Sequence, residues 1–112
     1  MCIRDSGKTM NEKIDSRNVC IFAEGEVDRC PTGSGVSGRM AIHHKRKELS
    51  IGKTMAIESI IDSVFIGSIV REEKYGELDS VIPQVEGTAH VVGEMEFLLD
   101  PKDLIGKGFI LR

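Results

Sequence analysis

The chain has 112 residues, 40% apolar residues and a formal net charge of −3, which suit one globular domain with a moderate core. The small charge argues against a nucleic-acid surface, because phosphate binding needs a concentrated positive field, and no apolar run is long enough to cross a membrane. One tyrosine and no tryptophan leave no aromatic platform on which bases could stack.

The cysteines Cys2, Cys20 and Cys30 are sparse and odd in number, so they do not form a disulfide framework. A reducing compartment, the cytoplasm, is therefore expected. The first residues contain none of the apolar stretch that a secretory signal requires.

Residues 1–6, Met-Cys-Ile-Arg-Asp-Ser, resemble translated adapter sequence rather than the start of a fold. We predict that they are a non-native leader, as an expression scar would be. Residues 7–17 are polar and show no periodic pattern of apolar residues, which predicts a loop or a broken end. The domain proper is therefore expected at residues 18–112, and the natural reading frame is expected to continue upstream, which would make this chain a fragment.

Residues 19–23, Val-Cys-Ile-Phe-Ala, predict a buried strand. A turn rich in glycine and hydroxyl groups follows at residues 28–39 and leads into a helix expected from about residue 33 to about residue 48, with Thr32 as its N-cap. Three glycines in its first half each cost the helix about 1 kcal/mol relative to alanine, which suggests close approach by backbone or ligand. The basic residues 43–47 complement the negative end of the helix dipole.

From residue 54 onward the pattern predicts strands. They are expected at residues 54–61, 63–73, 81–86, 89–99 and 108–111, with turns at 75–77 and 87–88 and one short helical turn at 101–104. One strand, one helix and then an antiparallel meander indicate the α+β class, with a mostly antiparallel sheet wrapped around one central helix.

The stretch Asp28-Arg29-Cys30-Pro31-Thr32-Gly33-Ser34-Gly35 resembles a signature of the proline racemase family, Asp-Arg-Ser-Pro-Cys-Gly-Thr-Gly. Further segments that resemble the family lie at residues 18–23, 63–67, 87–90 and 108–109. The resemblance implies the diaminopimelate-epimerase-like fold. It also implies that this chain is the C-terminal portion of a two-domain enzyme whose active site lies between the domains.

The resemblance implies substrate-binding roles for Asp28, Gly33 and Ser34. The backbone N–H groups of Gly33 and Ser34 would bind the substrate carboxylate, and Asp28 would bind the ring nitrogen. Outside this signature, Asp28 would be interpreted as a turn or capping residue. Gly35 and Gly38 are expected to be packing residues.

Thr32 stands where racemases and epimerases of the family carry their second catalytic cysteine, and Pro-Thr-Gly-Ser-Gly resembles the trans-3-hydroxy-L-proline dehydratases. Racemisation needs a base on each face of the α-carbon, and a threonine hydroxyl is too weak an acid to become one. A single cysteine base on the other domain can remove the α-proton while the 3-hydroxyl leaves as water, with Thr32 as the catalytic hydrogen-bond donor, directly or through an ordered water. The resemblance thus implies a lyase that forms pyrroline-2-carboxylate, and a fragment without that base is expected to be inactive alone.

Two alternatives stay open. One is an isomerase of the 4-hydroxyproline 2-epimerase or proline racemase type, which would exchange the α-proton with inversion. The other is an inactive fragment or a small ligand-binding domain that kept the fold. Cys30, where the family usually has serine, is interpreted as a small buried filler, with a displaced base as the other interpretation.

No metal and no organic cofactor are expected. His43 and His44 are adjacent on a helix and point about 100 degrees apart, so they do not form the i, i+4 metal pair. They are interpreted as a solvated helix end, and His90 as a paired or exposed histidine in a strand.

The expected partner is a small imino acid, with no nucleic acid and no membrane. Family members are often dimers, but the sequence holds no isolated signal for a dimer.

Overall fold

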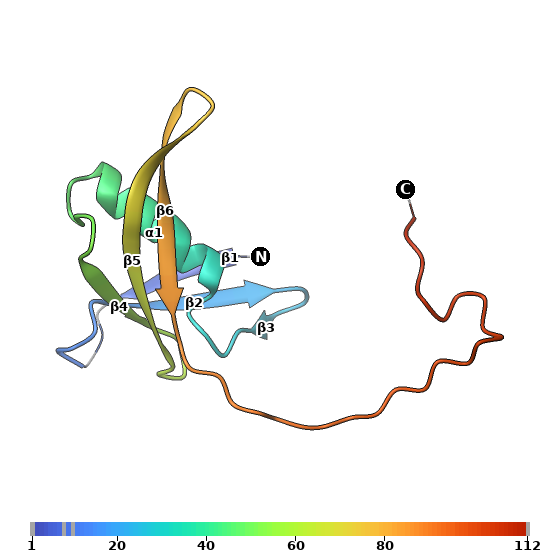
Figure 1. Cartoon of the computed structure of the whole chain (residues 1–112). Helices are drawn as coiled ribbons and strands as arrows, with labels where there is room; N and C mark the ends of the chain where they lie inside the picture. Colours follow the sequence, from blue (N-terminus) through green and yellow to red (C-terminus); the bar gives the residue numbers. More distant parts are fainter. Residues whose placement is uncertain (1, 8, 10, 112) are drawn as a thin grey trace.

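The computed structural model describes residues 2–7, 9 and 11–111, and within these ranges one helix lies against a curled, six-stranded sheet (Figure 1). The elements in chain order are β1 (Cys2–Gly7), β2 (Ser16–Phe22), β3 (Glu26–Val27), α1 (Gly33–Lys45), β4 (Thr54–Glu58), β5 (Val64–Tyr75) and β6 (Leu78–Glu86). The α+β class is therefore confirmed.

The sheet is mixed, with its strands in the order β1-β2-β4-β5-β6 and with the short β3 paired to β2. All neighbours are antiparallel except β2 and β4, which run parallel with Ser16 opposite Ile57. Parallel neighbours need a long crossover connection, and residues 23–53, which include β3 and α1, supply it. Pro83 lies on β6, an edge strand, opposite Ile69 at the register shift between Ile69 and Arg71, and sheets tolerate proline at such edge and bulge positions.

The predicted helix is confirmed but ends earlier than expected, at Lys45 rather than near residue 48. The N–H of Arg46 still donates to the Ile42 carbonyl at 3.0 Å, whereas the N–H of Lys47 donates to the His44 carbonyl at 2.9 Å. Lys47 has a φ of 63°, so the chain leaves the helix through a left-handed residue. The basic cluster thus lies partly in the last turn and partly in the loop that follows.

The core lies where α1 crosses β5. Its buried apolar residues are Val36, Met40, Leu49, Ile57 and Ile69. Gly67 of β5 lies beneath the helix, where an added Cβ would stand 2.7 Å from Met40 Sδ and 3.0 Å from Val36 Cγ1. Close approach of helix and sheet therefore depends on a strand glycine.

Two glycines of α1, Gly33 and Gly38, were expected to allow close approach by a backbone or a ligand, but no atom of another element lies close to either. A Cβ built on Gly33 or on Gly38 meets no atom within 4 Å. The prediction that Gly38 is a packing residue is therefore wrong. The backbone at both positions is open to the surface of the helix.

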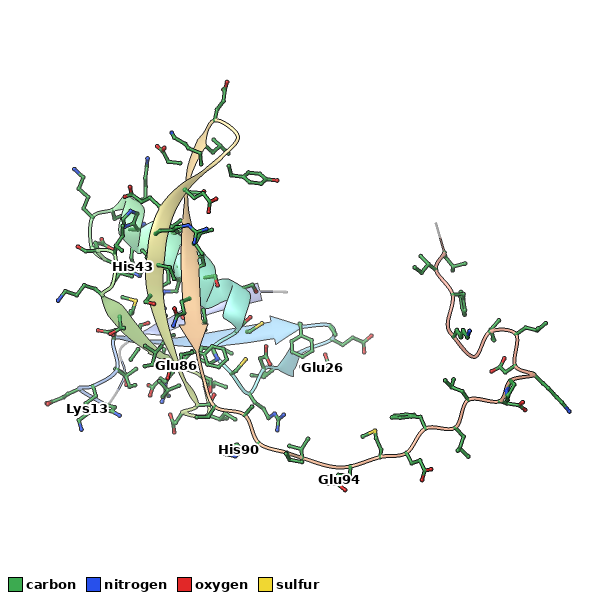
Figure 2. The ribbon with its side chains drawn as sticks, viewed as in Figure 1. Lys13, Glu26, His43, Glu86, His90 and Glu94 are labelled. Carbon is green, nitrogen blue, oxygen red and sulfur yellow. The ribbon has the colours of Figure 1, made fainter. Side chains whose placement is uncertain are left out.

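After β6 the chain leaves the sheet as an extended segment, residues 87–111, which we call the C-terminal arm (Figure 1). The strands predicted at 89–99 and 108–111, and the turn at 87–88 between strands, are wrong. His90 and Glu94 lie on this arm, so His90 is not in a strand either (Figure 2). The alternation of apolar residues was sufficient to predict strands, but a strand also needs a neighbouring backbone, and the arm has none among the described residues.

The arm exposes most of its apolar side chains; those most exposed include Val91, Leu98, Leu104 and Leu111. Its one region of local structure is a series of turns. The N–H of Asp103 donates to the Asp100 carbonyl at 3.0 Å, so residues 101–104 contain a hydrogen-bonded turn but not the short helical turn that was predicted.

Strand β1 falls within the predicted leader and the residue after it, and it pairs with β2 through register partners from Cys2 opposite Ile21 to Gly7 opposite Arg17. An edge strand offers unpaired N–H and C=O groups to any neighbouring backbone, whatever its origin. The pairing is therefore compatible with a non-native leader, which stays a prediction. Within the described ranges, the helix is too short and too polar to cross a membrane.

Candidate functional site

The candidate site lies where the chain passes from β3 into α1, over residues 28–32, which we call the site loop. The N–H of Asp28 donates to the carbonyl of Cys20 on β2 at 3.0 Å, so the loop starts from a fixed point on the sheet. Asp28 and Cys30 are half-buried, and Pro31 is fully buried. The last residue of the loop, Thr32, is the N-cap of α1, so the loop leads directly into the first helical turn.

Thr32 occupies the N-cap position, as the sequence predicts, but its side chain makes no capping bond to the helix. Its φ is 68° and its ψ is 124°, and only 6% of the residue is exposed. A β-branched residue rarely adopts a positive φ, and such strain costs about 1–3 kcal/mol and is concentrated at functional sites. The hydroxyl stands 3.4 Å from the Ser34 hydroxyl, so it is held at the start of the helix without capping it.

The first turn of α1 can bind an anion. Its leading N–H groups have no partner within an α-helix, and the helix dipole adds partial positive charge there. Gly33 and Ser34 are both exposed, and no acidic residue lies in this turn. Backbone donors at an open helix N-terminus are suited to a carboxylate or a phosphate.

All four predicted site residues therefore belong to one short stretch at one end of α1: Asp28 at the start of the site loop, Thr32 at its end, and Gly33 and Ser34 in the first helical turn. Their roles toward a substrate stay predictions. Cys30, which the sequence predicts to be a small buried filler, is a half-buried free thiol two residues before Thr32. Within the described part of the chain, no group of three or more His, Cys, Asp or Glu residues is arranged to hold a metal ion.

Sequence reasoning missed the side chains that fasten the site loop from outside. Asn18 of β2 and Ser63, next to the start of β5, each hydrogen-bond to a carbonyl of this loop. The only sequence signal for Asn18 was a polar residue at an inward-facing position of a strand whose alternate residues are buried. Ser63 carried no such signal.

The two adjacent histidines lie at the other end of α1, each with a carboxylate partner (Figure 2 labels His43). His43 Nδ1 lies 2.6 Å from Glu48 Oε2, and His44 Nε2 lies 2.8 Å from Glu72 Oε1. His44 also borders an open groove between the end of α1 and the β5–β6 hairpin. Both are half-buried and paired, which corrects the prediction of a simply solvated helix end.

Protonation of His44 is favoured by both of its neighbours. Its Nδ1 lies 3.0 Å from the Leu49 carbonyl oxygen, which, like the Glu72 carboxylate, can only accept a hydrogen bond. Only the imidazolium carries two N–H donors at once. The Leu49 carbonyl first, and the Glu72 carboxylate second, raise the pKa of His44 above its ordinary value.

This pKa shift predicts that stability falls as the pH rises. Because the pKa of His44 is higher in the folded than in the unfolded chain, its contribution is complete below the unfolded pKa of about 6.5 and is lost as the pH rises through the folded pKa. Thermal melts of wild type and His44→Gln between about pH 5 and pH 8 should therefore converge toward high pH. His90→Gln, which removes an exposed histidine of the arm, is the matched control; a wild-type advantage that stays constant over this range would contradict the prediction.

Comparison with known proteins adds the family. The sequence profile described as proline racemase matches residues 1–110. A trans-3-hydroxy-L-proline dehydratase from Colwellia psychrerythraea is 45% identical over 102 residues, which are 91% of this chain and 29% of that protein. A 3-hydroxyproline 2-epimerase from Burkholderia multivorans is 45% identical over 95 residues, 85% of this chain and 28% of that protein.

A solved structure is similar as well. The crystal structure of a hydroxyproline epimerase from Agrobacterium vitis, with bound trans-4-hydroxy-L-proline, matches with a TM-score of 0.72 and 30% identity over 90% of this chain and 29% of that one. The chain thus spans less than a third of the length of the relatives it matches. The profile match over nearly every residue, together with this structural likeness, shows that the chain belongs to the proline racemase family.

Proposed function

We propose that this chain supplies the substrate-carboxylate cradle and a hydroxyl donor to an enzyme that eliminates water from trans-3-hydroxy-L-proline. The observation that carries the proposal is Thr32, a buried hydroxyl residue held with positive φ at the open N-terminus of α1. The names of relatives at 45% identity, dehydratase and 2-epimerase, support an enzyme that acts at the α-carbon of a hydroxyproline.

The chemistry of the hydroxyl favours elimination over inversion. A cysteine thiolate outside this chain would remove the α-proton. As the carbon–oxygen bond on the neighbouring ring carbon breaks, the hydroxyl would leave as water by taking up a proton relayed from the cysteine thiol through ordered water, which restores the thiolate. Thr32 would donate a hydrogen bond to that leaving oxygen, directly or through a water, while Gly33 and Ser34 hold the carboxylate and Asp28 the ring nitrogen. The enamine formed then tautomerises to pyrroline-2-carboxylate, and none of these steps calls for a metal or an organic cofactor.

An isomerase is the second candidate, because one similar relative is named 3-hydroxyproline 2-epimerase. Inversion requires that a second base return a proton to the opposite face of the α-carbon. Thr32 cannot become that base, and Cys30 is the thiol nearest to it along the chain. A product with inverted configuration at the α-carbon would support this second candidate.

We also propose that the complete enzyme has the diaminopimelate-epimerase-like fold and acts in the cytoplasm, where the free thiols of Cys20 and Cys30 would stay reduced. Its partner would be the imino acid itself, with neither nucleic acid nor membrane involved, and a homodimer is the assembly to test by light scattering.

A chimera tests the function. In it, the aligned part of this chain replaces the matching segment of the Colwellia psychrerythraea dehydratase, with the unaltered dehydratase as positive control. We expect the chimera to convert trans-3-hydroxy-L-proline to pyrroline-2-carboxylate, measured by chromatography of the product. A folded chimera that forms only the 2-epimer, or no product, would refute the proposed elimination.

The chain alone should be inactive, because the main base is expected to lie outside it. We expect no pyrroline-2-carboxylate above the buffer blank when the 112-residue protein is incubated with trans-3-hydroxy-L-proline. The chimera assayed in parallel provides the control for assay sensitivity. Turnover by the isolated chain would show that it contains a complete site.

A further inference from the structure

Asn18 connects three parts of the fold from a fully buried position on β2. Its Nδ2 lies 3.5 Å from the carbonyl oxygen of Pro31 in the site loop, and its Oδ1 accepts a hydrogen bond of 2.6 Å from Arg39 of α1. The amide thus uses its donor end on the loop and its acceptor end on the helix. A buried amide satisfied at both ends restrains the groups that it joins.

A pair of serine hydroxyls reaches the same loop from the β4–β5 turn. Ser59, also fully buried, accepts hydrogen bonds of 3.2 Å from the N–H groups of Ile61 and Ser63, and its Oγ lies 2.8 Å from Ser63 Oγ. The Ser63 hydroxyl donates in turn to the carbonyl of Arg29. Because Ser59 Oγ accepts two N–H groups, its own proton is directed to Ser63, and the series runs one way toward the site loop.

The site loop is therefore held at two carbonyls, Arg29 and Pro31, that lie close to Thr32 in the chain. Thr32 has a backbone conformation that β-branched residues rarely adopt, and such a conformation persists only where the surroundings over-determine it. We propose that Asn18 and the Ser59–Ser63 pair are positioning residues that hold Thr32 at its positive φ. The catalytic part of this inference rests on the proposed function, whereas the conformational part does not.

The conformational part is tested by NMR on the full chain without ligand. Scalar couplings report the φ of Thr32, and amide signals report Gly33 and Ser34. In Ser63→Ala and in Asn18→Asp, which keeps the acceptor but loses the Nδ2 donor, we expect the Thr32 couplings to shift toward those of a negative φ. Ser63→Thr keeps the hydroxyl and should restore the wild-type couplings.

Matched controls remove the same groups elsewhere. Ser80→Ala deletes a hydroxyl that donates to the Glu73 carbonyl at 2.9 Å in the β5–β6 hairpin. Asn11→Asp changes an exposed amide whose Oδ1 accepts from the N–H of Lys13. Neither control should move the Thr32 couplings.

The catalytic part is tested in the chimera. We expect Ser63→Ala to lower kcat about tenfold, the effect of one hydrogen bond, with little change in KM, because Thr32 would act only in the transition state.

If Ser63→Ala and Asn18→Asp lower the melting temperature but leave the Thr32 couplings unchanged, the inference is overturned and the two groups merely stabilise the fold. Should Asn18→Asp fail to fold, Ser63→Ala and its threonine rescue decide the matter alone. An inactive wild-type chimera would refute the proposed function and leave the conformational test intact.

Discussion

Replacing Thr32 with alanine in the chimera should lower kcat for water elimination at least about 100-fold, the usual cost of removing one hydrogen-bond donor directed at charge that develops in the transition state. The buried hydroxyl at the N-cap position is the group we assign to the leaving oxygen, and alanine removes it while keeping the backbone. Thr32→Ser keeps a hydroxyl and should retain most of the activity. Steady-state kinetics on all three proteins make the comparison.

The matched control is Ser37→Ala, which deletes a hydroxyl of the same helix that donates to the Gly33 carbonyl at 2.8 Å. Its kcat should stay near that of the unaltered chimera. If Thr32→Ala retained full activity with an unchanged melting temperature, the hydroxyl would have no part in the chemistry. The carboxylate cradle would then be the only contribution of this end of the helix.

Thr32→Cys extends the same prediction to the choice of reaction. A thiol at a helix N-terminus ionises more readily than a free thiol, so the variant would place a second base on the opposite face of the α-carbon. We expect it to form the 2-epimer and, in deuterated water, to introduce deuterium at the inverted α-carbon. Formation of the dehydrated product alone would contradict the idea that a missing second base is what prevents inversion.

Replacing Met40 with alanine should produce the largest loss of stability, about 2–5 kcal/mol, because it leaves a cavity in a small core. Met40 is fully buried and belongs to the apolar cluster between α1 and the sheet. The upper end of this loss reaches the lower end of the unfolding free energies of small domains, about 5 kcal/mol, so partial unfolding at 37 °C is expected. Chemical denaturation measures it, and Ile42→Ala, at a half-exposed position of the same helix, should change stability by less than about 0.5 kcal/mol.

Gly67→Ala tests the same contact from the sheet. Its new methyl would lie 2.7 Å from Met40 Sδ, so it should cost about 1–3 kcal/mol by overpacking. In the double variant the alanine at position 67 occupies part of the cavity at position 40, so the two losses should sum to more than the loss in the double variant. Additive losses would show that α1 and β5 do not share this contact.

The sequence by itself determined where the candidate site lies along the chain, because the four candidate residues lie within seven consecutive positions and a helix start is governed by local chemistry. It also located α1 and strands β2, β4, β5 and β6, since a strand buried on one face and a helix with a small-residue end both leave local periodic signals. The signature that carries the family resemblance is this same contiguous stretch, and for that reason the family could be recognised before any contact was known.

Only the tertiary structure decided what depends on contacts between distant residues. The bonds that fasten the site loop join residues 13 and 34 positions apart. The inward-facing polar position of Asn18 does not identify its partner, and no local pattern in the sequence marks Ser63. In the C-terminal arm the sequence predicted strands that the structure does not contain. An alternation of apolar residues predicts a strand whether or not a neighbouring strand is present. The positive φ of Thr32 is likewise visible only in the tertiary structure, because threonine by itself disfavours that conformation.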